Sequence, residues 1–125
     1  MQRFFICKKC KTMVALVKKG KCIPDCCGDE MTEIIPGTVE ASKEKHIPVI
    51  DIKGDLVTVS VGEVEHPMIA EHYIEWISIE TNLGNQRKTL EPDEKPVRTF
   101  KLLDGEKLIS AYAYCNLHGL WKASV

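Results

Sequence analysis

Short runs of β-branched and aromatic residues recur along the last two thirds of the chain and are separated by polar segments. Alternation of apolar and polar positions is clearest in Tyr73–Ile79. A period of two residues is typical of a strand with one buried face, and β-branched and aromatic residues favour strands. We therefore predict strands at Val49–Ile52, Leu56–Val61, Tyr73–Ile79, Val97–Leu102 and Leu108–Tyr114.

Glycine and proline residues separate these runs, and they are typical of turns. We predict turns at Lys53–Asp55, Leu83–Asn85, Pro92–Pro96 and Asp104–Glu106. The chain has no long helical period, internal repeat or low-complexity tract. Seven or so strands at this spacing predict an all-β fold with an antiparallel β-sandwich.

The segment before the strands differs in character. Pro36-Gly37 predicts a turn, and the polar stretch Glu40–Lys45 predicts a loop. We place a domain boundary here and expect two domains, residues 1–36 and 37–125. A chain of 125 residues suits one modest domain with a small appendage, because single domains cluster at roughly 100–150 residues.

The overall charge changes this picture little, since the formal net charge is -1. Such a balance favours neither nucleic acid nor an anionic membrane as a partner. The start of the chain, Met1–Cys7, lacks the apolar core of a signal peptide. No stretch approaches the ~20 apolar residues that span a bilayer. We therefore expect a soluble cytoplasmic protein.

Five of the six cysteines crowd between positions 7 and 27. Disulfide frameworks belong mainly to secreted chains, so metal binding is the favoured interpretation. Cys7-Lys-Lys-Cys10 and the adjacent pair Cys26-Cys27 offer four thiolates for a tetrahedral site, and Gly28 permits a sharp turn after the pair. A segment of ~36 residues is also below the ~40 at which a domain usually needs metal or disulfides.

Ligand type leaves the metal of this first site open between zinc and a single iron. Cys22 is a fifth thiol in the same segment, in Lys-Cys22-Ile-Pro-Asp-Cys26. It could replace Cys26 as a ligand if the chain folded back differently. We favour Cys26 and Cys27 as ligands and treat Cys22 as a spare thiol.

A second group of metal-capable side chains comprises every histidine of the chain and its one isolated cysteine, namely His46, His66, His72, Cys115 and His118. A lone histidine is more often an ordinary hydrogen-bonded residue than a ligand. Cys115-x-x-His118, however, follows a predicted strand and can turn two donors toward one point. Pro67 stiffens the loop that carries His66.

Five nitrogen and sulfur donors exceed the four that zinc prefers. They suit an iron ion that keeps one open position, and an open position implies chemistry on a small oxygen or nitrogen species. A thiolate ligand would donate electron density to that iron.

Together these motifs resemble the desulfoferrodoxin family of two-iron superoxide reductases. The matching motifs are Cys-x-x-Cys with a later Cys-Cys, Glu-Lys-His-x-Pro, His-Pro-Met, Glu-His-Tyr-Ile-Glu-Trp and Tyr-Cys-Asn-Leu-His-Gly. They occur in the same order as in the family and extend over nearly the whole chain. Cys22 is the main departure from the family pattern.

The resemblance implies two non-haem iron ions per chain. A desulforedoxin- or rubredoxin-like domain would hold the first iron through Cys7, Cys10, Cys26 and Cys27. An immunoglobulin-like sandwich would hold the catalytic iron through equatorial His46, His66, His72 and His118 and axial Cys115. Glu44 would fill the open sixth position in the oxidised enzyme, and Lys45 would lie beside the open face.

The implied activity is reduction of superoxide to hydrogen peroxide without evolution of dioxygen, as protection against oxidative stress. The resemblance also implies a rubredoxin-like electron donor and a homodimer. The residues alone leave open a non-enzymatic electron carrier and a sensor of oxygen or nitric oxide, whereas five donors disfavour a structural zinc protein. Four aromatic residues near these motifs are expected to form sandwich core or a cover for the metal site, namely Tyr73, Trp76, Tyr114 and Trp121. Met68 is expected to provide packing.

Overall fold

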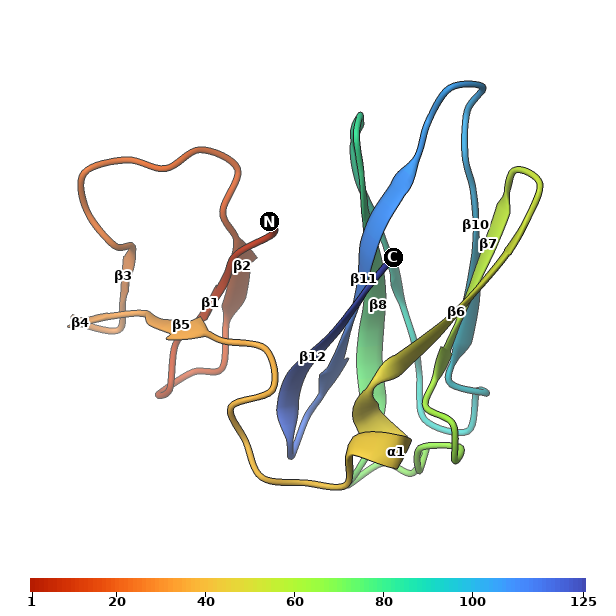
Figure 1. Cartoon of the computed structure of the whole chain (residues 1–125). Coiled ribbons are helices and arrows are strands. Elements are labelled where there is room, and N and C mark those ends of the chain that lie inside the picture. The colour runs from red at the N-terminus through yellow and green to blue at the C-terminus, as the bar shows by residue number, and fades with distance from the viewer. The chain divides into compact units, whose positions relative to one another are not determined.

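The computed structural model describes residues 1–125, which form two compact units, Met1–Ile35 and Pro36–Val125 (Figure 1). Nearly all regular structure is β-strand, so the predicted all-β class is confirmed. The single helix, α1 (Lys43–His46), is four residues long. No helix is long and apolar enough to cross a membrane.

The first unit contains a three-stranded antiparallel sheet and a small hairpin. In the sheet, β1 (Phe4–Ile6) lies between β2 (Met13–Ala15) and β5 (Thr32–Ile34). The hairpin pairs β3 (Asp25–Cys26) with β4 (Asp29–Glu30).

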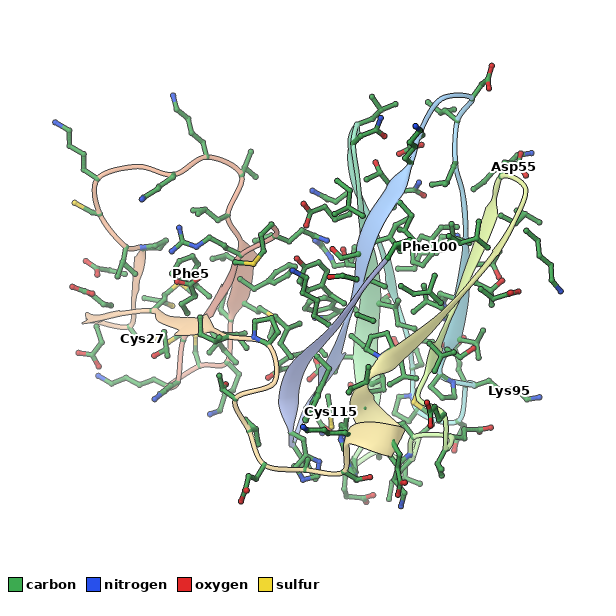
Figure 2. The ribbon with its side chains drawn as sticks, in the orientation of Figure 1. Phe5, Cys27, Asp55, Lys95, Phe100 and Cys115 are labelled. Carbon is green, nitrogen blue, oxygen red and sulfur yellow. The ribbon has the colours of Figure 1, made fainter.

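The apolar core of this first unit is small. Its fully buried cluster consists of Phe5, Cys7 and Met31, and three partly buried residues pack against it, Val14, Leu16 and Cys26. Figure 2 shows Phe5 directed into this unit. Because two of these six residues are cysteines of the predicted metal site, little apolar area remains to stabilise the unit without a metal.

The second unit is a sandwich of two antiparallel sheets (Figure 1). The three-stranded sheet has the order β10-β7-β6, and the four-stranded sheet has the order β12-β11-β8-β9. The strands are β6 (Pro48–Lys53), β7 (Leu56–Val61), β8 (Ile74–Thr81), β9 (Gly84–Thr89), β10 (Val97–Lys101), β11 (Leu108–Cys115) and β12 (Gly119–Ser124). Seven strands divided three and four match the predicted immunoglobulin-like sandwich.

Alternating burial along the strands builds the core between the sheets. In β7, Val57, Val59 and Val61 are buried and alternate with more exposed residues. Phe100 of β10 is fully buried and lies between the sheets (Figure 2). Cys115, at the end of β11, belongs to the same buried cluster. The core therefore extends to the end of the sandwich where the second donor group lies.

All five strands named from the sequence are present: Leu56–Val61 matches β7 at both ends, and no end of the other four shifts by more than two residues. The pattern did not locate β9 and β12. β9 is an edge strand of almost wholly exposed polar residues, so it has no apolar alternation to detect. Glu40–Lys45 was expected to be a loop, yet its last three residues lie in α1. Tertiary contacts stabilise that single turn, as described below.

Candidate metal centres

The first cysteine pair lies on a tight turn after β1. The amide of Cys7 donates to the carbonyl oxygen of Thr12, and the amide of Lys11 donates to the carbonyl oxygen of Cys7, both at 2.8 Å. Lys11 adopts a φ of 68° to close the turn. The amide of Cys10 lies 3.5 Å from Cys7 Sγ, so a backbone N–H is directed at a sulfur, as Cys-x-x-Cys spacing predicts.

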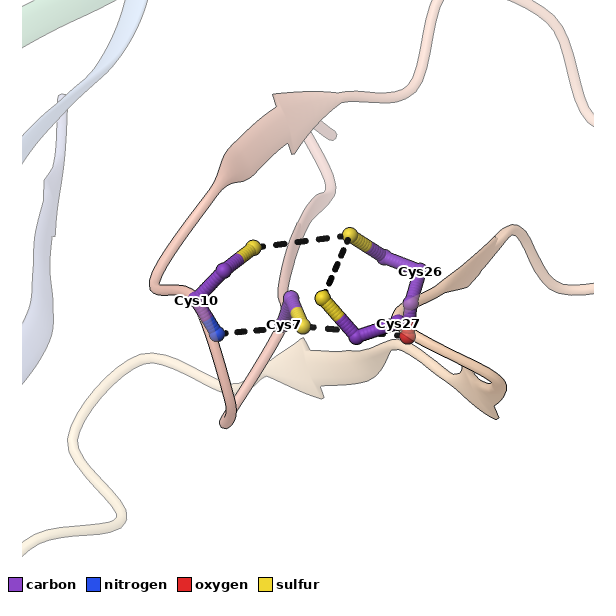
Figure 3. Close-up of side chains that lie close together, drawn as sticks. All are labelled: Cys7, Cys10, Cys26 and Cys27. Carbon is purple, nitrogen blue, oxygen red and sulfur yellow. Dashed lines mark hydrogen bonds between the residues drawn. The ribbon is translucent and has the colours of Figure 1, made fainter.

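The second pair lies on the β3–β4 hairpin, where Cys27 and Gly28 have φ values of 52° and 82°. Cys26 Sγ is 3.5 Å from Cys10 Sγ and 3.9 Å from Cys27 Sγ (Figure 3). All four sulfur atoms of the Cys7, Cys10, Cys26 and Cys27 group lie within 4.8 Å of one another. Cys22 is exposed and lies outside this group.

Electrostatics in this group favours a bound cation. The hydroxyl and backbone amide of Thr12 lower the pKa of Cys10 to about 6, whereas proximity to Cys10 and Cys7 raises the pKa of Cys26 to about 12. One thiolate forms easily and then opposes ionisation of its neighbours. A cation removes that repulsion, so the crowded sulfur atoms fit a thiolate-bound metal.

The second group assembles residues from distant parts of the sandwich. His46 ends α1, His66 lies in the loop after β7, and His72 lies in the turn before β8. Cys115 ends β11, and His118 lies in the turn to β12. His46, His66 and Cys115 are buried, with 2%, 1% and 0% of their surfaces exposed.

The donor atoms of this group lie close together. The Nε2 atom of His46 is 3.1 Å from Nε2 of His66 and 3.2 Å from Nδ1 of His118. Cys115 Sγ is 3.9 Å from the same His118 nitrogen. Donor atoms of His46, His66, His72 and Cys115 all lie within 4.8 Å of one another. His118 is not one of those four, but its Nδ1 lies beside two of them, His46 and Cys115, and can supply a fifth donor.

Hydrogen bonds behind two of the rings determine which nitrogen is available. His46 Nδ1 is 2.6 Å from the carbonyl oxygen of Ser42, and His66 Nδ1 is 2.7 Å from the carbonyl oxygen of Pro67. A carbonyl oxygen only accepts, so Nδ1 carries the proton and Nε2 keeps its lone pair. Metal-binding histidines usually have such a partner on the second ring nitrogen.

His72 supplies an independent indication of a cation. Its Nε2 atom is buried and has no hydrogen-bond partner. A buried polar atom without a partner is costly, and a metal ion would satisfy it. Four nitrogen atoms and one sulfur atom, with this unpaired nitrogen among them, thus fit an iron ion at the end of the sandwich.

Burial sets the charge of these side chains. It is the main cause that lowers the pKa values of His46 and His72, and it lowers the pKa of His66 to about 4. These three rings are therefore neutral near pH 7, which is the form that binds a metal. Burial raises the pKa of Cys115, and backbone N–H groups of His118 and Leu117 partly offset that effect.

A β-bulge in the pairing of β8 with β11 helps to orient the donor side chains. Tyr114 pairs with Trp76, but the next residue, Cys115, pairs with Ile74, so Glu75 is the extra residue of β8. Bulges often redirect side chains beside active sites. This shift places Ile74 and Cys115 together in the core at the strand end that follows His72.

Gly62 is a site-supporting residue that no sequence motif indicated. A Cβ atom at this position would lie 2.6 Å from the carbonyl oxygen of Glu44 and 3.1 Å from the amide nitrogen of His46. The Glu44 carbonyl oxygen also accepts a hydrogen bond of 3.0 Å from the amide of Val64. The loop after β7 therefore packs directly on the backbone of α1. This contact orients the helix and, with it, His46.

Glu44 and Lys45 both lie on α1, but the structure places them differently. Glu44 is exposed and lines a surface hollow with Ser42, Ile47 and Glu63, and its carboxylate is outside the converging donor group. Lys45 is half-buried. Its positive charge contributes, after burial and the neighbouring histidines, to the lowered pKa values of two ligand-type rings, His46 and His72.

The fold and the two donor groups define a non-haem metalloprotein with two metal centres. A family model described as desulfoferrodoxin matches residues 38–124. The chain belongs to the desulfoferrodoxin family, as the resemblance of its motifs predicted, and has two iron centres, one at each donor group.

Individual relatives extend over nearly the whole chain. The desulfoferrodoxin homolog of Archaeoglobus fulgidus is 39% identical over 123 residues, which cover 98% of this chain and 97% of the relative. The crystal structure of the superoxide reductase from Treponema pallidum has a TM-score of 0.85 at 35% identity, covering 99% of this chain and 98% of that one.

A smaller relative matches a part of the chain. The superoxide reductase (1Fe-SOR) from Giardia intestinalis has a TM-score of 0.58 at 36% identity, covering 66% of this chain and 98% of its own. Proteins named superoxide reductase are oxidoreductases, and this chain is an enzyme of the same class.

Proposed function

We propose that this chain is a superoxide reductase, which converts superoxide to hydrogen peroxide by the addition of one electron and two protons, without release of dioxygen. The observation that supports this best is the convergence of four imidazoles and one buried thiol. Five donors leave one position of an octahedral iron for a small ligand. The activity is also the one named for the Treponema pallidum protein.

In this proposal residues 37–125 form the immunoglobulin-like catalytic domain, with His46, His66, His72, His118 and Cys115 as iron ligands. When bound there, iron supplies the electron that reduces superoxide. The protein holds the imidazoles neutral by burial, and it orients two of them through the carbonyl oxygens of Ser42 and Pro67. The backbone N–H groups of Leu117 and His118 favour the thiolate form of Cys115.

Lys45 and Glu44 have separate roles in the proposal. The ammonium group of Lys45, whose field reaches His46 and His72, attracts the superoxide anion to the site. Glu44 would offer a hard carboxylate oxygen as a sixth ligand to oxidised iron. Because Glu44 is exposed in the structure, that role requires its side chain to turn toward the donor group.

We further propose that residues 1–36 form a desulforedoxin-like domain whose iron is held by Cys7, Cys10, Cys26 and Cys27. A rubredoxin-like protein would supply electrons, and the chain would act as a homodimer in the cytoplasm to remove superoxide under oxidative stress. The exposed sulfur-bearing residues Cys10 and Cys27 support electron exchange at this domain, because they bring the centre to the protein surface.

The test is pulse radiolysis of the reduced, iron-loaded protein, in buffer that contains the dioxygen from which the pulse forms superoxide, with wild-type Cys115 and with Cys115→Ser. We expect rapid loss of superoxide, one peroxide for each superoxide consumed and no evolution of dioxygen. Cys115→Ser should slow the reaction by at least ~10-fold, since even partners behind metal ligands contribute roughly 10–100-fold. Cys22→Ser is the matched control, because Cys22 is exposed and lies outside both donor groups.

Three results would contradict the proposal. Evolution of dioxygen would indicate a dismutase, and equal rates for wild type and Cys115→Ser would exclude a role for the thiolate. An iron-loaded protein that does not consume superoxide but exchanges electrons at the cysteine site would instead be an electron carrier.

A further inference from the structure

Trp121 contacts two residues of the second donor group, His118 and His46. Its indole Nε1–H donates a hydrogen bond of 3.0 Å to the carbonyl oxygen of His118. Its ring also packs on the imidazole of His46, with centroids 5.0 Å apart and planes tilted by 31°. His46 and His118 are 72 residues apart in the sequence, so one side chain contacts two donor residues that come from opposite ends of the domain.

The segment that leads into α1 borders the same indole. Residues of this segment, including Val39, line a shallow hollow together with Lys43 of α1 and Trp121. The amide of Gly37 donates to the carbonyl oxygen of Leu120, the residue before the tryptophan, at 2.8 Å. Trp121 is only 4% exposed, so water has little access to its contacts with His46 and His118.

The contacts of Trp121 affect how the His46 and His118 rings are oriented relative to each other. The rings of His46 and His118 meet nearly at right angles, at 88° with centroids 4.9 Å apart, and their donor nitrogen atoms are 3.2 Å apart. The hydrogen bond from His46 Nδ1 to the Ser42 carbonyl oxygen orients only the first of these rings, and the two rings lie on segments 72 residues apart. The hydrogen bond from Trp121 limits movement of the His118 backbone, while the indole face limits rotation of the His46 ring.

We propose that Trp121 is a positioning residue that sets the angle between the His46 and His118 imidazoles and so tunes the metal that they hold. The inference deepens the proposed function, because it concerns the same iron site. Ordinary packing is the competing explanation, and Trp76, the other tryptophan of the chain, is also buried and offers a comparison. Trp76 stacks on Tyr114, with centroids 5.8 Å apart and planes at 12°, rather than on a donor imidazole.

Titration of the metal-free full chain with Co²⁺ tests the proposal without any assay of superoxide. The ligand-field spectrum reports the angles between the donors of the nitrogen and sulfur site, and bands of the four-cysteine site serve as an internal reference. Trp121→Phe keeps an aromatic face on His46 but removes the N–H donor. Trp121→Leu removes both, and Trp76→Phe is the matched control.

We expect Trp121→Leu to weaken Co²⁺ binding at the histidine site by roughly 10–100-fold, the usual effect of losing a partner behind a metal ligand. Trp121→Phe should weaken it less, and both should shift the ligand-field bands while the four-cysteine bands stay unchanged. Trp76→Phe should match wild type. Thermal unfolding and circular dichroism confirm that each variant is folded.

The proposal is overturned if a folded Trp121→Leu variant shows the wild-type affinity and spectrum, or if Trp76→Phe changes both as much as Trp121→Leu does. Because Co²⁺ binding is independent of turnover, a wild-type protein that fails to reduce superoxide would refute the proposed function and leave this inference standing.

Discussion

At the scale of single residues, the chemistry of the second site depends on atoms that lie behind the donors. Ser42 and Pro67 contribute only carbonyl oxygens, yet these decide that His46 and His66 present Nε2. His118 presents Nδ1 instead. Mixed use of the two ring nitrogens lets four imidazoles approach one point from α1, from the connection between β7 and β8 and from the turn between β11 and β12.

Lys45 is the residue whose charge is expected to control encounter with the substrate. Lys45→Ala should slow association with superoxide by about 10-fold at low ionic strength, the lower end of electrostatic steering effects. The difference from wild type should shrink as salt is added, because the Debye length falls to ~10 Å at 0.1 M. Pulse radiolysis over a series of ionic strengths measures both effects.

Lys53→Ala is the control for Lys45→Ala. Lys53 is far more exposed, with 83% of its side chain accessible, and pairs with Asp51 in β6. Its removal changes net charge equally but should leave the rate close to wild type. Equal rates for Lys45→Ala and wild type at low salt would remove the steering role.

At the scale of elements, the segment that carries His46 depends on tertiary contacts. α1 has one turn, closed by a hydrogen bond of 2.9 Å from the amide of Ile47 to the carbonyl oxygen of Lys43. An isolated helix of this length is unstable in water. The loop after β7 holds it in place through Gly62 and Val64.

Gly62→Ala should therefore disturb α1 and the histidine site together. A methyl group there would lie 2.6 Å from the carbonyl oxygen of Glu44, which belongs to the backbone and cannot move aside easily. We expect a loss of about 1–3 kcal/mol in the free energy of unfolding, typical of overpacking, and weaker metal binding at the histidine site. Chemical denaturation and metal titration measure these effects.

Gly20→Ala provides the comparison, because a Cβ atom at Gly20 meets nothing within 4 Å and its φ is not positive. That variant should retain wild-type stability and metal affinity. If Gly62→Ala behaved in the same way, the close approach of the two backbone segments would not constrain His46.

At the scale of the whole molecule, the two units differ in what stabilises them. The sandwich has a buried apolar cluster of twelve residues, whereas the first unit has a fully buried cluster of three, one of which is Cys7. Area buried from water is the main source of folding free energy. We therefore expect the sandwich to fold around its own core and the first unit to depend on its metal.

Removal of metal should destabilise the first unit much more than the second. After chelation, amides of Met1–Ile35 should lose protection from hydrogen exchange, whereas amides in the core strands β7, β8 and β11 should stay protected. Re-addition of iron should restore protection in the first unit. Continued protection of β1 and β5 in verified metal-free protein would show that the small core is sufficient.

The sequence by itself determined the kinds of donor and the sandwich. Cysteine spacing and the contexts of four histidines identified the two donor groups, and alternation identified five strands with apolar inner faces. Edge strand β9 escaped detection because its exposed residues need no apolar face. These are local properties, which depend on neighbours a few positions apart in the chain.

Only the tertiary structure decided how the donors meet. It brought His46 to His118, selected the nitrogen of each ring, placed Trp121 against both residues and required glycine at position 62. The nitrogen choice at His46 and His66 is made by carbonyl oxygens close to them in the chain, whereas the meeting of His46 with His118, the contact of Trp121 with His46 and the need for glycine at position 62 depend on segments far apart in the sequence. Such contacts form only when the two sheets pack, and so the arrangement of the five donors follows from packing rather than from any local pattern.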